Sequence, residues 1–148
     1  MRLFLLFGLF GWVAEIVWTA LYDAVSGTQR APGDAAARRP STKGERWRLE
    51  GRTYLWMLPI YGGGGLAFVQ VHALVAAWPW FFRGAIYCVG SFAVEAAGGW
   101  ILKLTTGRIP WDYSYARWSA LGGAIRLDYA PVWFAFGFIL EAVERFIR

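Results

Sequence analysis

Four long apolar runs constrain this chain more than any other feature. They cover residues 3–23, 54–77, 82–104 and 130–147. A helix rises about 1.5 Å per residue, so roughly 20 apolar residues cross the ~30 Å hydrocarbon core of a bilayer. We therefore predict an all-α fold, an integral membrane four-helix bundle that forms a single domain over residues 1–148.

The composition agrees with a bilayer environment. Of the 148 residues 57% are hydrophobic, and ten Trp and seven Tyr suit the aromatic belts at the two membrane interfaces. The net charge of +5 would also fit a nucleic-acid partner, but the cations lie in loops between the apolar runs and no recognition motif accompanies them. We therefore predict the lipid bilayer as a partner and no nucleic acid.

The distribution of cations predicts an orientation. Four crossings put both chain ends and the Trp78 turn on one side, and the long loops on the other, including the basic loop 26–52. The long-loop side holds eleven Lys and Arg residues against four on the other side. The positive-inside rule then predicts cytoplasmic long loops and outside termini. We expect the membrane to be the inner membrane of a bacterium. Anionic lipid headgroups are the expected contacts of the basic loop.

Weak internal similarity suggests a duplication. Each half contains a small residue four positions before a glutamate, then a short Arg-Leu-acidic stretch, then a proline. Each half would be helix, cytoplasmic loop, helix, so the bundle would consist of two parallel helix-loop-helix repeats. In the second run, the glycines at 62–65 indicate either very close packing by another helix or a local break in the helix.

Three glutamates interrupt the apolar runs. A carboxylate at the bilayer centre costs about 2.5 to 3.5 kcal/mol, so Glu15, Glu95 and Glu141 should face the bundle interior. Gly11, Ser91 and Gly137 each precede one of them by four residues, on the same helix face. We expect the three to converge on one interior site. The alternatives are buried carboxylic acids that serve packing alone and, for Glu141, an ion pair with Arg145.

Other polar residues extend this candidate site. His72 is the single histidine, and we favour a polar packing role over a metal ligand because no paired His or Glu-x-x-His motif accompanies it. Near the interface, Asp112 and Ser114 would cap a turn that Trp111 anchors, or Asp112 would close the mouth of the polar site with Arg126 or Arg108. No cofactor-binding motif is present, so we predict no cofactor.

Several motifs in order resemble a known family, the transmembrane protein 229 family and its bacterial relatives, the Putative ABC-transporter type IV permeases. The resemblance covers nearly the whole chain except residues 26–48. It implies a four-helix membrane protein with functional interest at Tyr61, Trp111 and Asp112 besides the glutamates. The matching motifs are Gly11-Trp12-x-x-Glu15, Pro59-Ile60-Tyr61-Gly62, Glu95-x-x-Gly98, Pro110-Trp111-Asp112-Tyr113-Ser114, Gly123-x-Ile125-x-Leu127-Asp128-Tyr129-Ala130 and Trp133 to Glu141.

Three functions remain open from the sequence. The first is a permease- or channel-like protein, working as a homo-oligomer or with a partner membrane subunit, in which Glu15 and Glu95 bind a proton, a cation or a small polar solute. The second is a membrane-embedded enzyme that acts on a lipid or polyprenyl substrate through the carboxylates and His72. The third is a non-catalytic accessory or assembly subunit. We rank them in this order.

Overall fold

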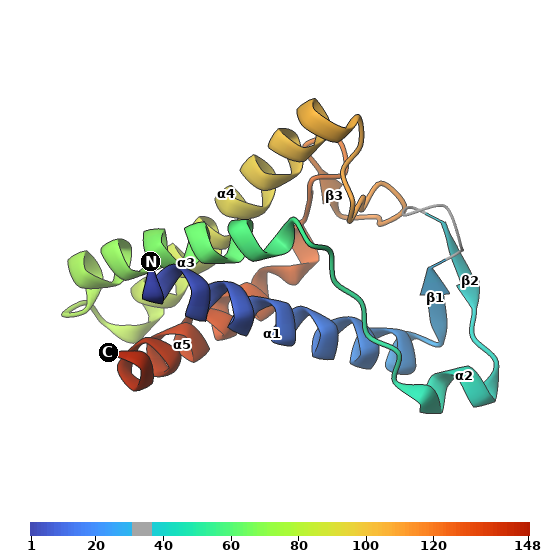
Figure 1. Cartoon of the computed structure of the whole chain (residues 1–148), viewed down its shortest axis with the longest axis horizontal. Coiled ribbons are helices and arrows are strands. Elements are labelled where there is room, and N and C mark those ends of the chain that lie inside the picture. The colour runs from blue at the N-terminus through green and yellow to red at the C-terminus, as the bar shows by residue number, and fades with distance from the viewer. Residues whose placement is uncertain (31–36) are drawn as a thin grey trace.

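The computed structural model describes residues 1–30 and 37–148, and helices dominate it (Figure 1). The helices are α1 (Arg2–Ser26), α2 (Lys43–Arg48), α3 (Met57–Val75), α4 (Trp80–Thr106) and α5 (Ala130–Ile147), with a 3-10 turn η1 (Leu127–Tyr129) before α5. Two antiparallel hairpins lie in the loops, β1 (Thr28–Arg30) with β2 (Arg38–Pro40) and β3 (Ser119–Ala120) with β4 (Ile125–Arg126).

The helices α1, α3, α4 and α5 lie where the apolar runs predict helices. The described residues also form short strands, so the predicted all-α fold is not fully correct. The predicted loop 26–52 contains β1, β2 and the short helix α2, which begins with a capping box between Thr42 and Glu45. In the second loop, Leu121, Gly122 and Gly123 adopt positive φ and make the turn between β3 and β4. Such short strands leave no alternating pattern in the sequence, so the prediction missed them.

Three helices in the described part of the chain are long and apolar enough to cross a membrane, namely α1, α3 and α4. Helix α5, expected as the fourth span, is not among them. It has 18 residues and carries Glu141, Glu144 and Arg145. The fold is thus that of a helical membrane protein, and a bundle with four spans stays a prediction.

Glycines allow α1 and α3 to pack closely. A Cβ added at Gly11 would lie 2.2 Å from the ring of Tyr61, and one at Gly65 would lie 2.3 Å from Phe7. A Cβ at Gly62 would meet Phe4 at 2.8 Å. Helix α3 runs unbroken through the four glycines. Of the two readings of that run, close packing by another helix is therefore confirmed.

The second half of the chain repeats this pairing, since α4 packs mainly on α5. Gly84 faces the ring of Phe134, and Gly137 faces Tyr87, with distances of 2.4 and 2.5 Å for an added Cβ. Each half consists of two long helices joined by a segment that contains a hairpin, with α2 as an additional short helix in the first half. The duplication itself stays a prediction. In Figure 1 both termini and the turn between α3 and α4 lie at one end of the molecule, and both hairpins lie toward the other.

At the end with the termini, Glu141 is buried in a cluster of charged groups. Arg83 Nε of α4 lies 3.1 Å from Glu141 Oε1, and the Tyr87 hydroxyl donates to the same oxygen at 2.8 Å. Arg145 Nη2 lies 3.5 Å from Glu141 Oε2, which confirms the expected ion pair one turn along the helix. The Glu141 carboxylate thus has two guanidinium groups and a hydroxyl beside it.

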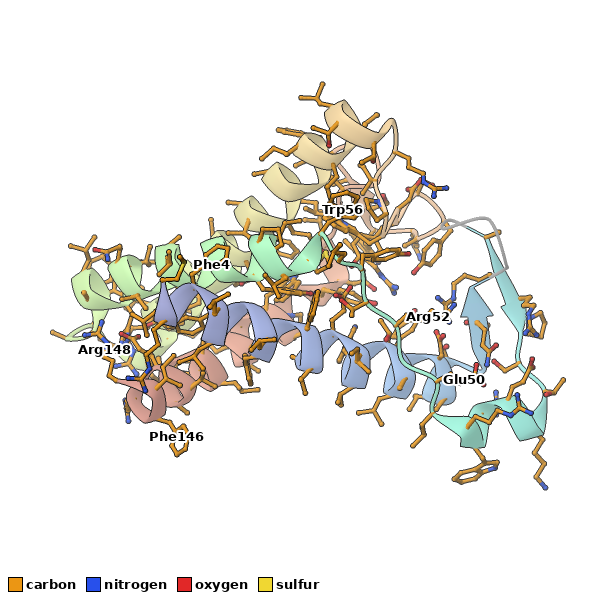
Figure 2. The ribbon with its side chains drawn as sticks, in the orientation of Figure 1. Phe4, Glu50, Arg52, Trp56, Phe146 and Arg148 are labelled. Atoms are coloured by element: carbon orange, nitrogen blue, oxygen red, sulfur yellow. The ribbon has the colours of Figure 1, made fainter. Side chains whose placement is uncertain are left out.

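His72 belongs to the same cluster. Its Nδ1 lies 2.7 Å from Glu144 Oε2, and its Nε2 lies 4.0 Å from Glu141 Oε1. Glu144 also pairs with Arg148 at 2.6 Å. We call Arg83, Tyr87, His72, Glu141 and Glu144 the terminal-end cluster. Its contacts join α3, α4 and α5. Figure 2 shows Arg148 at the opposite end of the molecule from Arg52.

The glycine contacts predict opposite effects for neighbouring positions of α3. Gly65→Ala should lower the free energy of unfolding by about 1 to 3 kcal/mol, because its methyl group would overlap Phe7. Gly63→Ala should be neutral or stabilising by up to about 1 kcal/mol, because nothing lies within 4 Å of its Cβ position. Thermal unfolding of the detergent-purified variants measures both. Equal shifts in the two midpoints would contradict the close packing.

The terminal-end cluster predicts a difference between two arginines that contact the same carboxylate. Arg83→Gln should cost about 3 kcal/mol, since the Arg83 side chain is only 20% exposed and Glu141 is buried. Arg145→Gln should cost less than about 1 kcal/mol, since the Arg145 side chain is 74% exposed. The midpoint of thermal unfolding checks the difference, and a larger loss for Arg145→Gln would refute it.

Candidate functional site

A cavity of about 530 Å³ lies among α1, α3, α4 and α5. Its walls are mostly aliphatic and aromatic side chains. Its polar lining comes from two regions, a central pair of glutamates and a group of charged residues near the loops. Segments far apart in the sequence contribute to it, including the residues that precede α3 and the loop between α4 and α5.

Glu15 lines the cavity from α1, two turns before Asp23. The Thr53 hydroxyl, in the segment that leads into α3, donates to Glu15 Oε2 at 2.5 Å. The Tyr61 hydroxyl of α3 also lies beside the Glu15 carboxylate. Because Gly11 lets the Tyr61 ring sit against α1, the close helix contact also brings this hydroxyl to Glu15.

Glu95 lines the same cavity from α4. The Tyr113 hydroxyl and the Trp133 indole lie beside its carboxyl group, and it lies close enough to Glu15 for the two groups to interact electrostatically. Glu95 Oε2 and Trp133 Nε1 are both buried, yet neither makes a hydrogen bond. Burial and the charge of Glu95 raise the pKa of the Tyr113 phenol well above its usual value, so Tyr113 stays protonated.

Trp111 forms a rigid wall of the cavity. Its indole nitrogen donates to the Ala124 carbonyl oxygen at 3.0 Å, and its ring packs over Gly99 of α4. Tyr113 donates its backbone N–H to the Gly123 carbonyl oxygen at 2.9 Å. The loop between α4 and α5 is therefore folded back against the helices and holds two aromatic side chains at the cavity.

Charged residues line the cavity near the loops. Asp23 accepts from Arg38 Nη2 at 2.5 Å and also pairs with Arg52, which Figure 2 shows on the segment between α2 and α3. Arg126 lies nearby, with Nη1 donating to the Tyr22 hydroxyl at 2.9 Å and Nη2 lying 2.7 Å from Asp128 Oδ2. This pairing raises the pKa of Arg126 and lowers that of Asp128, so both stay charged at neutral pH.

The structure brings four of the seven predicted site residues together. Glu15, Tyr61, Glu95 and Trp111 all line the cavity. Glu141 and His72 do not, because α5 runs antiparallel to α4 and carries Glu141 to the level of Arg83 and Tyr87. Glu95 is two helical turns further along α4 than Tyr87, about 12 Å at 1.5 Å per residue. The expected convergence of three glutamates is therefore wrong for Glu141.

Asp112 serves the turn. Its Oδ1 accepts from the backbone N–H of Ser114 at 2.9 Å, and Arg126 pairs with Asp128 instead. Of the two roles that the sequence left open for Asp112, the structure therefore shows the one in which its side chain caps the turn. Within residues 1–30 and 37–148, no group of three His, Cys, Asp or Glu residues is arranged to hold a metal ion.

Sequence reasoning missed several lining residues. Tyr113 and Trp133, beside Glu95, come from a loop and from the first turn of α5, and both stand inside motifs of the family resemblance. Asp23 and its arginines Arg38 and Arg52 are separated by at least 15 residues, and only the folded loops bring them together. The spacing of residues along a single helix, on which the sequence prediction relied, cannot reveal contacts between residues of different segments.

Two comparisons with known proteins bear on the chain. No solved structure matches it. Residues 37–147 match the family described as Putative ABC-transporter type IV. The match covers α2 to α5, including Tyr61, Glu95, Trp111 and Trp133, and it agrees with the three apolar helices of a membrane protein. The chain therefore belongs to the Putative ABC-transporter type IV family.

Proposed function

We propose that this protein is a permease- or channel-like membrane protein in which the Glu15 and Glu95 carboxylates bind a proton or a cation inside the cavity. The observation that carries the proposal is their geometry. Two carboxylates from different helices line one cavity and interact with each other, in segments apolar enough to span a membrane.

The energetics favour a bound positive charge. Each carboxylate in the apolar region costs about 2.5 to 3.5 kcal/mol or more, and two ionised carboxylates repel each other. A proton or cation between Glu15 and Glu95 would relieve that repulsion. Neutral donors contact both carboxylates and would orient them, with Thr53 and Tyr61 at Glu15 and Tyr113 at Glu95.

The orientation and the partners belong to the same proposal. We place the hairpins and α2 in the cytoplasm of a bacterial cell and the termini outside, following the excess of cations in the long loops. Helix α2 would lie at the inner surface, since Trp47 is 80% exposed and Lys43, Arg46 and Arg48 flank it, suiting anionic headgroups. Assembly with further copies or with a partner membrane subunit is expected for a chain of this size.

Ion flux into liposomes tests the Glu15–Glu95 site. Liposomes with the wild-type protein should take up protons in response to a potassium diffusion potential, or take up sodium or potassium down its concentration gradient. The rate of uptake should exceed that of empty liposomes. Glu95→Gln and Glu15→Gln should each reduce the flux at least tenfold, because the amide carries no charge for the ion to balance. A pH-sensitive dye and radioactive cation uptake measure the rates.

Glu50→Gln is the matched control. It removes one carboxylate charge at an exposed position, where Glu50 lies 3.5 Å from Arg48. Its flux should equal that of the wild type. The proposed function is wrong if protons, sodium and potassium each cross as fast with Glu95→Gln as with the wild type. It is also wrong if wild-type liposomes pass none of these ions faster than empty liposomes.

A further inference from the structure

The cavity is long as well as apolar. On α1 its lining begins at Phe7 and ends at Asp23, sixteen residues later, which is about 24 Å at 1.5 Å per residue. On α3 it extends from Met57 to Val71, about 21 Å by the same rise. One leaflet of a bilayer with its headgroups is about 20 to 22 Å thick, half of the whole membrane. The cavity therefore has the length of a membrane lipid.

The two ends of the cavity differ in polarity. At the end toward the termini, the wall is formed mainly by apolar side chains, among them Phe7, Phe10, Ile139 and Leu140. Toward the loops, the charged groups among the described lining residues are Asp23, Arg38 and Arg52. A molecule with a hydrocarbon chain and a charged head matches this order, because the chain leaves water while the head keeps polar partners.

The charged end carries an excess of one positive charge. Asp23 Oδ1 accepts from Arg38 at 2.5 Å, and Asp23 Oδ2 pairs with Arg52, so one carboxylate faces two guanidinium groups. The ring of Tyr22 helps to hold Arg38 at the cavity, since the guanidinium carbon lies 5.1 Å from the ring centroid. The Arg52 side chain is 41% exposed, and a guanidinium has five N–H donors, so Arg52 can bind a further oxygen. Guanidinium groups bind phosphate through paired hydrogen bonds, so this end suits an anionic phosphate headgroup.

The carboxyl groups midway along the cavity are held by the wall. Glu15 accepts from the Thr53 hydroxyl at 2.5 Å, and the Tyr61 hydroxyl lies beside it. The Tyr113 hydroxyl lies beside Glu95 in the same way. These donors belong to the protein, so a hydrocarbon chain alongside the two carboxyl groups takes away none of their contacts.

The cavity opens to the hydrocarbon of the bilayer along one edge of α1. Val13, Val17 and Leu21 follow one another at intervals of four residues, line the cavity, and are 60%, 50% and 49% exposed. Ile139 lines it from α5 and is 49% exposed. Helix α1 packs mainly on α3, and α5 mainly on α4, so this edge lies between two less closely packed helices. All four side chains are apolar, so a lipid chain meets no polar barrier between α1 and α5.

We propose that the cavity binds one anionic phospholipid from the leaflet on the loop side, with a hydrocarbon chain between α1 and α5 and the phosphate group at Arg38 and Arg52. In the proposed orientation this is the cytoplasmic leaflet. The inference goes beyond the proposed function, because it assigns a second ligand to the cavity, through the arginines and the apolar wall rather than through the carboxylates. It predicts lipid binding whether or not ions cross the membrane.

Native mass spectrometry of the purified protein tests the headgroup and the chain. Delipidated wild-type protein in detergent is mixed with equal amounts of phosphatidylglycerol and phosphatidylcholine that have identical chains. One phosphatidylglycerol per protein should bind, at least tenfold more tightly than phosphatidylcholine. Glycerol phosphate, an anion with no chain, should not displace it. Equal binding of the two lipids, absence of bound phosphatidylglycerol, or displacement by glycerol phosphate would overturn the inference.

Two matched pairs of variants then locate the site. Arg52→Gln should weaken phosphatidylglycerol binding at least fivefold, whereas Arg48→Gln should bind as the wild type does, because Arg48 is 70% exposed on α2 and lies outside the cavity lining. Gly90→Phe should abolish binding, because Gly90 lines the cavity and nothing lies within 4 Å of its Cβ position, so the ring can take the space of the chain. Gly63→Phe is its control, since Gly63 has the same free space outside the cavity lining.

The variants separate a cavity site from general attraction to the basic loop. Size-exclusion profiles and unfolding midpoints establish which proteins are folded, and Arg52→Gln decides if Gly90→Phe does not fold. Unchanged binding by folded Arg52→Gln or Gly90→Phe protein, or an equal loss for Arg48→Gln and Arg52→Gln, would overturn the inference. Ion flux that depends on Glu95 without phosphatidylglycerol binding would overturn this inference alone and leave the proposed function standing.

Discussion

The close contact between α1 and α3 determines much of the rest of the structure. Gly11 lets the ring of Tyr61 lie against the α1 backbone, and Gly65 lets the ring of Phe7 lie against the α3 backbone. In consequence the Tyr61 hydroxyl and the Thr53 hydroxyl, at and before α3, both reach Glu15. A carboxylate one turn from a glycine is thus held by the neighbouring helix, because in an apolar solvent helices associate through close packing and hydrogen bonds.

Sequence periodicity and length predicted the long helices well, because a bilayer demands unbroken apolar runs whose ends are easy to find. The predicted run 54–77 corresponds to Met57–Val75, and the predicted run 130–147 is the observed α5. The hairpins escaped prediction because strands of two or three residues are too short to show an alternating pattern. The pairing of β3 with β4 depends on turn geometry at Gly122 and Gly123, which no hydrophobic pattern encodes.

The candidate site was predictable only in part, for a geometric reason. The rule that a small residue precedes each glutamate correctly indicates an inward face, and Glu15, Glu95 and Glu141 all face inward. It carries no information on depth. In two antiparallel helices, residues lie at the same level when they are equally far from the loop that joins the helices. Glu141 therefore meets Arg83, near the start of α4, and does not meet Glu95. Tyr113 and Trp133 reach Glu95 because the second loop folds back, which sequence spacing does not reveal.

The three glutamates of the apolar runs therefore differ in their surroundings more than in their positions on the helices. Glu141 lies against two guanidinium groups and a tyrosine hydroxyl, so its charge is balanced and its role is to join helices. Asp23, nearer the loops, is balanced by two arginines in the same way. Glu15 and Glu95 instead face hydroxyl groups and aromatic rings across a large cavity. Since a buried charge needs a counter-charge, Glu141 and Asp23 are held by their arginines for a structural role, and the two carboxylates of the cavity are the ones that we propose to bind a positive charge.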